Sequence, residues 1–146
     1  MKENSPIFFI EEIWAYLSPF SAHQIEIWGE KFATVEHAYQ TKKFLAGPAQ
    51  DEIKNTKSAY SAWRTNWKYK SDKSLLNPDF DKLKVMEELC RAKIAQHKEV
   101  LEVLKMTGDR GLLKNVESDF YWGVGKDGSG ENMLGKLWMK IRSEIQ

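Results

Sequence analysis

The chain has 146 residues, enough for one domain with a buried core, and its 22 basic and 21 acidic side chains leave a net charge of +1. This balance argues against a protein whose main role is to coat a polyanion, because such binding depends on many contacts to phosphates. A single cysteine excludes an internal disulfide and indicates a reducing compartment. The start of the chain is polar and no apolar run approaches membrane length, so we expect a cytoplasmic protein that is not bound to a membrane.

The first elements in chain order are expected to be short strands. Residues 7–13 begin with the apolar run Ile-Phe-Phe-Ile, which is typical of a strand. Residues 24–32 alternate in polarity around Gly29, which predicts a small hairpin.

Helices are expected to follow. The first should begin after the capping residue Thr34 and end at Gly47-Pro48, because a left-handed glycine followed by proline commonly terminates a helix. Two more helices are predicted at residues 49–55 and 58–70. Residues 54–73 are rich in lysine and arginine, and such a patch either meets phosphate or is simply a solvated surface.

In the second half, Asn77 and Pro78 are the residue types that cap and open a helix, so the longest helix is predicted to start there. A break is expected at His97, a stop at Gly108, and a last helix at residues 132–145. Apolar residues recur at helical spacing in the long helix and predict its buried side: Phe80, Leu83, Met86, Leu89, Cys90 and Ala92. In the last helix the corresponding residues are Leu134, Leu137, Trp138 and Ile141. The whole pattern predicts a mainly α protein with a small β element, an α+β fold of one domain.

A polar stripe runs along the first predicted helix. Glu36, Tyr39, Gln40 and Lys43 recur at spacings of three, four and seven, so they share one side. From the pattern alone a solvated surface is the simpler explanation. Glu36 lies in the first turn, where the helix dipole and free N–H groups favour its charged form, and a carboxylate can stabilise a positive sugar carbon or activate water.

The most unusual stretch is residues 118–135, in which Asp119 and a Phe-Tyr-Trp triplet precede five of the nine glycines. Glycine adds no packing, so this density indicates special backbone angles or close approach of a ligand to the main chain. The rings of Tyr121 and Trp122 can either stack on a flat ligand or pack at the edge of the hydrophobic core. We interpret the stretch as a ligand site.

Three other motifs are set aside. The glycine spacing at residues 123–128 matches a dinucleotide fingerprint, but no second strand can follow. Asp127 opens a weak calcium-loop match that has Trp138 where a glutamate is required. The histidines show no ligand spacing with Cys90, so no metal site is expected.

Several blocks together resemble the NADAR/YbiA-like family. The stretches at residues 34–44, 118–123 and 130–135, the last followed by Met139-x-x-Arg142, look like its signature blocks. Weaker matches are Leu17-Ser-Pro-Phe, Asn77-Pro-Asp-Phe-Asp and residues 92–97. They follow the family's order, so the resemblance implies one YbiA-like domain over residues 1–146 with its core at about residues 7–145.

The resemblance implies an N-glycosidase that cleaves a ribose C1–N bond without a metal or redox cofactor. Members of this family act on phosphoribosyl-amine intermediates of riboflavin synthesis, while others remove ADP-ribose from guanine in nucleic acid, some as antitoxins. It therefore implies a nucleotide-like small molecule or ADP-ribosylated nucleic acid as partner, with an ADP-ribosyltransferase toxin as a functional partner. The alternative is a module that binds ADP-ribose or a nucleotide without cleaving it.

Carried over residue by residue, the resemblance assigns catalysis to Glu36, Asp119 and Lys43. Two departures from the family pattern are Phe80, where tryptophan is usual, and Lys114, where a glutamate is common. The residues expected to bind the substrate are Trp122, Tyr121, Gly123, Gly130, Asn132, Phe80 and Arg142.

Alternatives stay open for several of these residues. Lys43 either supplies charge or attacks a ring-opened C1 aldehyde as an imine, and the nearby Glu36 favours the first because it opposes the lowered pKa that the second needs. Asp119 is either catalytic or the cap of a turn. Backbone N–H groups of residues 123–130 suit phosphate oxygens. The hypothesis requires Glu36 and Trp122 to face one cavity.

Overall fold

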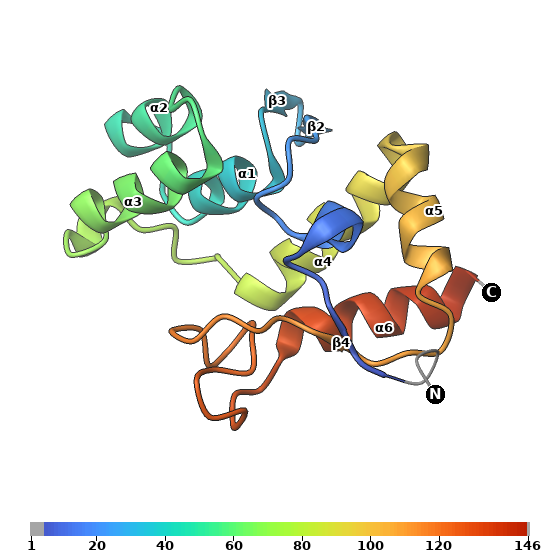
Figure 1. Cartoon of the computed structure of the whole chain (residues 1–146). Helices are drawn as coiled ribbons and strands as arrows, with labels where there is room; N and C mark the ends of the chain where they lie inside the picture. Colours follow the sequence, from blue (N-terminus) through green and yellow to red (C-terminus); the bar gives the residue numbers. More distant parts are fainter. Residues whose placement is uncertain (1–4, 146) are drawn as a thin grey trace. The chain divides into compact units, whose positions relative to one another are not determined.

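The computed structural model describes residues 5–145, in which six α-helices, two 3-10 helices and two small sheets are found (Figure 1). The mainly α fold with small β elements that the sequence predicts is confirmed. The chain divides into two compact units. The central unit is Pro19–Gln96, and the terminal unit combines the segment up to Ser18 with the segment from His97 onward.

The central unit begins with the predicted hairpin. Strand β2 (Ile25–Ile27) pairs antiparallel with β3 (Glu30–Phe32). The two loop residues, Trp28 and Gly29, have φ angles of 53° and 77°. Two positive φ angles define the turn type that matches the twist of the flanking strands, so the hairpin prediction is confirmed.

Three helices pack on one another after the hairpin: α1 (Val35–Lys42), α2 (Pro48–Lys54) and α3 (Ala59–Tyr69) (Figure 1). The predicted cap at Thr34 is confirmed, because its side chain accepts the N–H of His37. The predicted end at Gly47-Pro48 is wrong. Helix α1 ends at Lys42, and Pro48 instead opens α2. Proline is tolerated there because an N–H at the first position of a helix makes no hydrogen bond within the helix.

The start of the longest helix also differs from the prediction. After a 3-10 turn, η3 (Lys73–Leu75), helix α4 (Lys82–Gln96) begins four residues beyond Pro78. Asn77 does not cap it: its Oδ1 accepts the N–H of Asp79 and its Nδ2 donates to the carbonyl of Lys42. Asp81 accepts the N–H of Lys84 and takes the capping role.

The apolar side of α4 is partly as predicted. Met86, Leu89 and Cys90 are buried, whereas Leu83 and Ala92 are half-buried and Phe80 precedes the helix. Burial raises the pKa of the Cys90 thiol to about 12, so this residue is a poor nucleophile, in agreement with the prediction.

The terminal unit contains a short parallel sheet of β1 (Ile7–Phe8) and β4 (Leu112–Leu113). The predicted strand at residues 7–13 is thus shorter, and its second part enters the 3-10 helix η2 (Glu12–Leu17).

Helices α5 (Lys98–Met106) and α6 (Met133–Ile145) complete the terminal unit. The predicted break at His97 and stop at Gly108 are both confirmed, with Gly108 in the left-handed region at φ 58°. The four apolar residues predicted for the buried side of the last helix are all buried, and Trp138 donates its Nε1–H to the carbonyl of Leu17 at 2.8 Å. Among the helices of residues 5–145, none has the length and hydropathy needed to cross a membrane.

Candidate active site

The polar stripe of α1 is buried and is not a solvated surface. Glu36, Tyr39 and Gln40 are 6%, 5% and 2% exposed. The simpler explanation offered by the pattern is therefore wrong. A carboxylate is rarely buried unless it is paired, so Glu36 needs local partners or a function.

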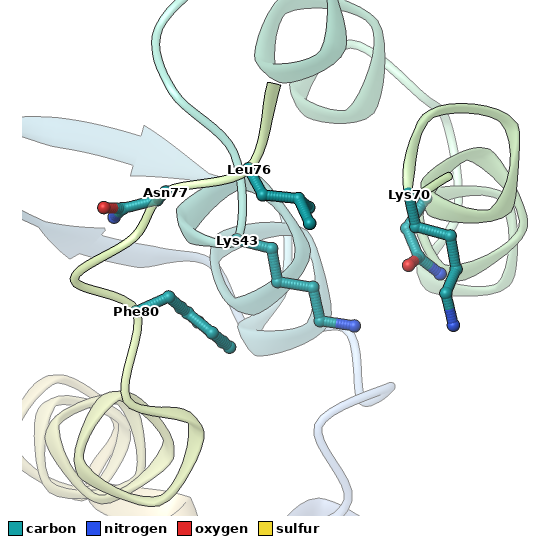
Figure 2. A pocket seen from close by; sticks show the side chains of 6 residues that line it. Lys43, Lys70, Leu76, Asn77 and Phe80 are labelled. Carbon is teal, nitrogen blue, oxygen red and sulfur yellow. The ribbon is translucent and has the colours of Figure 1, made fainter. Parts of the chain in front are cut away.

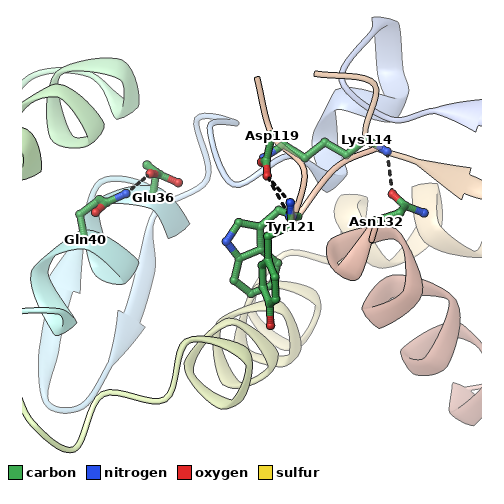
Figure 3. Close-up of polar contacts among 7 residues, drawn as sticks. Glu36, Gln40, Lys114, Asp119, Tyr121 and Asn132 are labelled. Atoms are coloured by element: carbon green, nitrogen blue, oxygen red, sulfur yellow. Dashed lines mark hydrogen bonds and ion pairs between the residues drawn. The ribbon is translucent and has the colours of Figure 1, made fainter. Parts of the chain in front are cut away.

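One partner of Glu36 is Gln40, whose Nε2 donates to Glu36 Oε2 at 2.6 Å (Figure 3). The backbone N–H of Glu36 donates to the carbonyl of Pro19 at 3.0 Å. The other amide atom, Gln40 Oε1, is buried and accepts no hydrogen bond from the described residues. The Gln40 side chain thus holds Glu36 through its Nε2, while its Oε1 stays available to accept a hydrogen bond.

The start of α1 is fixed by His37, which is fully buried. Its Nε2 donates to the carbonyl of Thr56 at 2.9 Å, and its Nδ1 accepts the hydroxyl of Thr34 at 2.8 Å. These bonds hold the first turn of α1 and leave Glu36 in a defined position.

The other end of the stripe, Lys43, reaches into a cavity of about 280 Å³ within the central unit. Figure 2 shows its side chain extending from the end of α1 into the space between Phe80 and the part of α3 that precedes Lys70. Asn66 from α3 and Leu76 and Asn77 from the segment after η3 complete the lining. The lining has two cations and no acid, which suits an anionic ligand.

Burial lowers the pKa of Lys43 from 10.5 to about 8. Glu36 raises the pKa, while the charges of Lys70 and Lys82 lower it further. Glu36 thus opposes the lowering of the Lys43 pKa, as the sequence argument expects, but burial outweighs it and the net shift is downward. Close to neutral pH, Lys43 has a reactive neutral fraction.

Aromatic contacts connect the stripe with the cavity. The rings of Tyr39 and Phe80 meet edge to face, with centroids 5.5 Å apart, and Lys43 Nζ lies 5.1 Å from the centroid of Tyr39. Phe80 is half-buried and lines the cavity, although the sequence alone favoured a core role for it.

Sequence reasoning missed four cavity residues. In the sequence, Lys70 belongs only to the basic stretch at residues 54–73, Asn77 is predicted to cap a helix, and Asn66 and Leu76 belong to no motif. One signal was available for Asn66: it follows Ala59 and Ala62 on the buried side of α3, and a buried amide needs partners. Its Nδ2 donates to the carbonyl of Trp63 at 2.6 Å.

In the terminal unit, the Asp119 carboxylate accepts backbone N–H groups from two residues of the aromatic triplet (Figure 3). Its Oδ1 accepts the N–H of Trp122 at 2.8 Å and of Tyr121 at 3.3 Å, and its Oδ2 pairs with Lys114 Nζ at 2.7 Å. Asp119 therefore does cap a turn. Lys114, the departure from the family pattern, is its ion-pair partner.

Burial raises the pKa of Asp119, but the charge and hydrogen bond of Lys114 and the two backbone N–H groups together bring this pKa below its usual value. The rings of Tyr121 and Trp122 meet at 85° with centroids 4.8 Å apart, and both side chains are half-buried. The predicted stacking role of these rings remains a prediction.

The glycines that follow allow backbone segments of the loop to approach one another closely. A Cβ on Gly123 would lie 2.6 Å from the carbonyl oxygen of Lys114, and a Cβ on Gly130 would lie 2.4 Å from that of Gly123. The N–H of Gly130 donates to the carbonyl of Val124 at 2.7 Å. Part of the glycine density thus reflects packing of the loop, and phosphate binding by its backbone remains a prediction.

Asn132 and Arg142 also have structural partners. Asn132 Nδ2 donates to the carbonyl of Leu112 and its Oδ1 accepts the N–H of Lys114. Arg142 Nη1 donates to the Thr107 hydroxyl and the carbonyl of Arg110, and burial lowers the pKa of its guanidinium. The substrate contacts predicted for both stay predictions, as does the shared cavity expected for Glu36 and Trp122.

A metal centre has no support in the described part of the chain, where no group of three or more His, Cys, Asp or Glu side chains is arranged to hold an ion.

Comparison with known proteins identifies the family. Residues 8–146 match the model of the NADAR domain. The chain belongs to the NADAR family. It is 35% identical to the N-glycosidase YbiA of Escherichia coli strain K12 over 88% of this chain and 79% of that protein. The NMR structure of E. coli YbiA superposes with a TM-score of 0.82 at 32% identity, covering 99% of this chain and 86% of that one.

Two other similar proteins extend the comparison. An N-glycosidase of Nostoc punctiforme is 35% identical over 88% of this chain and 84% of its own length. A riboflavin biosynthesis protein of Vibrio vulnificus is 32% identical over 98% of this chain, which spans 39% of that longer protein.

Proposed function

We propose that this NADAR protein is an N-glycosidase that hydrolyses the C1–N bond of a phosphorylated ribose. The observation that carries the proposal is the polar stripe of α1. The buried carboxylate of Glu36 shares one side of this helix with Lys43, whose side chain extends into the cavity. The names of the E. coli and Nostoc relatives support the reaction class. The substrate is a phosphoribosyl amine or an ADP-ribosylated guanine base.

In this proposal Glu36 acts at the sugar carbon. As the C1–N bond breaks, its electron pair leaves with the nitrogen and C1 gains positive charge, which a nearby carboxylate stabilises. Water then adds to C1, with its proton passing to the departing amine. Gln40 holds the carboxylate through its 2.6 Å hydrogen bond, and its buried Oε1 can accept a donor from the substrate or from that water.

The lowered pKa of Lys43 supports a second route, in the cavity that Lys43 lines. The neutral amine attacks C1 of the ring-opened glycosylamine and expels the base-side amine, so that an imine joins Lys43 to the sugar. Water then hydrolyses the imine and releases the sugar aldehyde and free Lys43. The burial and nearby cations that this route needs are both present.

The cavity lining supports a phosphorylated substrate. Lys70 and Lys43 supply positive charge, Asn66 and Asn77 supply amides, and Phe80 offers a ring against which a sugar or base can pack. On the resemblance, Asp119 joins the proposal as a catalytic residue, and Tyr121, Trp122 and the other predicted residues of the terminal unit join it as substrate contacts.

The test is release of free base. Wild-type protein and Glu36→Gln are incubated with a phosphoribosyl-aminopyrimidine and with an oligonucleotide bearing ADP-ribosyl-guanine, and the products are followed by chromatography. We expect turnover of at least one substrate by the wild type. Glu36→Gln should bind that substrate but release at most about one hundredth as much base, the scale of a lost acid–base group.

Binding without release, unchanged in Glu36→Gln, would contradict the proposal and support a module that holds ADP-ribose or a nucleotide uncleaved. A matched control is Glu102→Gln on α5, an exposed acid whose replacement should leave base release unchanged.

A further inference from the structure

Helix α3 carries its large apolar side chains on the outside. The residues buried on α3 are Ala59, Ala62 and Asn66. Tyr60, Trp63 and Trp67, by contrast, are 55%, 37% and 54% exposed. A soluble helix normally has the reverse arrangement, and an exposed run of large aromatics marks a surface that binds something. We call these three residues the aromatic ladder of α3.

The aromatic ladder is continuous. The ring centroids of Tyr60 and Trp63 are 5.8 Å apart, and those of Trp63 and Trp67 are 6.0 Å apart. Cations flank both ends: the Arg64 guanidinium lies 6.0 Å from the centroid of Tyr60, and Lys70 Nζ lies 4.0 Å from that of Trp67.

The charge around the ladder is positive. Helix α3 contains no acidic residue. Lys54 and Lys68 are neutralised by exposed ion pairs with Glu30 and Glu52. Four exposed cations take part in none of the ion pairs found among residues 5–145: Lys57, Arg64, Lys70 and Lys73.

We propose that the aromatic ladder of α3 binds single-stranded nucleic acid, with bases stacked on Tyr60, Trp63 and Trp67 and the flanking cations on the phosphates. Exposed rings interleaved with cations are what a strand without base pairing requires, since every base has a face that can stack. A second copy of this chain is a poorer occupant, because two such faces would place like charges together.

The ladder also leads to the cavity. Lys70 stands over Trp67 and at the same time lines the cavity that holds Lys43 (Figure 2). A strand lying on the ladder therefore has one end at the mouth of the proposed active site. Binding to the ladder needs no glycosidase reaction, so it is separable from the proposed function.

The experiment measures fluorescence anisotropy of labelled single-stranded RNA and DNA of about ten nucleotides, within the usual site size. The wild-type protein and Glu36→Gln should bind equally. Trp63→Ala and Trp67→Ala should each weaken binding about 5-fold or more, the scale of one lost stacking contact. Tyr60→Ala provides a third test at the most exposed ring, where folding is least affected.

Salt dependence separates stacking from charge. The logarithm of the binding constant should fall with the logarithm of the salt concentration, with a slope of about −0.7 for each phosphate contact. With four cations on phosphates, a fourfold rise in salt should therefore weaken binding about fifty-fold. Arg64→Gln should reduce the magnitude of that slope by about 0.7, whereas Trp63→Ala should lower affinity and leave the slope unchanged. Met106→Ala and Lys105→Gln, exposed positions on α5, are matched controls that should change neither.

Three results would overturn the proposal. The first is unchanged affinity in all three aromatic variants that retain the wild-type circular dichroism spectrum. The second is equal affinity for a duplex of the same length, whose bases are not available for stacking. The third is a dimer that becomes a monomer in Trp63→Ala, which would assign the ladder to a second copy.

Discussion

The pH dependence of catalysis tests the role of Lys43. With a pKa of about 8, its amine is neutral in about one tenth of molecules at pH 7 and about nine tenths at pH 9. If the neutral amine attacks C1, kcat/KM should rise about tenfold over this range with a midpoint near pH 8, because kcat/KM reports ionisations of the free enzyme.

Two variants sharpen this prediction. Lys43→Arg keeps a positive charge at every accessible pH but cannot form the imine, so base release should be lost while binding persists. Lys70→Gln removes a charge that lowers the pKa of Lys43, so the midpoint should move to higher pH. Base release is measured by chromatography of samples quenched at fixed times, in buffers of constant ionic strength.

A kcat/KM that falls as the pH rises through 8 would refute an attack by neutral Lys43. Turnover of Lys43→Arg at the wild-type rate would refute it as well. Either result would restore the purely electrostatic role for Lys43, with Glu36 and water carrying out the reaction alone.

Three further variants test other parts of the account. Phe80→Ala should raise KM about three- to tenfold through loss of a ring contact, while Phe80→Trp should retain it, as steady-state kinetics would show. Gly130→Ala places a Cβ 2.4 Å from the carbonyl oxygen of Gly123, and thermal unfolding should show a loss of about 1–3 kcal/mol; an unchanged Tm would contradict the close approach. Asp119 has a lowered pKa, so its ionised form stabilises the fold above about pH 3.8 and this contribution is lost as the pH falls through the folded value. Asp119→Asn should therefore unfold with a weaker dependence on acidic pH, measured by denaturant titration at several pH values.

Local signals in the sequence predicted the elements whose chemistry is local. The hairpin turn needs a residue such as Gly29 with positive φ, and the cap of α1 needs only the Thr34 hydroxyl and a nearby N–H. Two helix boundaries differ from the prediction because proline and asparagine occur at helix starts, after helix ends and in turns. Pro48 opens α2 instead of following α1, and Asn77 bonds to Lys42 and Asp79 instead of capping α4.

For the site, spacing predicted which residues of α1 share a side but not their burial. Whether Glu36 and Gln40 are solvated depends on the elements that pack over α1, and the 3.6-residue period carries no information about these. Lys70 and Asn66 were missed for the same reason. They reach the cavity of Lys43 from another helix, so only the packing of α3 against α1 brings them there.

The most direct test of the central claim combines binding and chemistry in one protein. Calorimetry of Glu36→Gln with the intact glycosylamine substrate, followed by chromatography of the same sample, should show affinity within about threefold of the wild-type KM and almost no free base. Free base appearing at the wild-type rate in that sample would contradict the account, because the buried carboxylate of α1 would then play no part in breaking the C1–N bond.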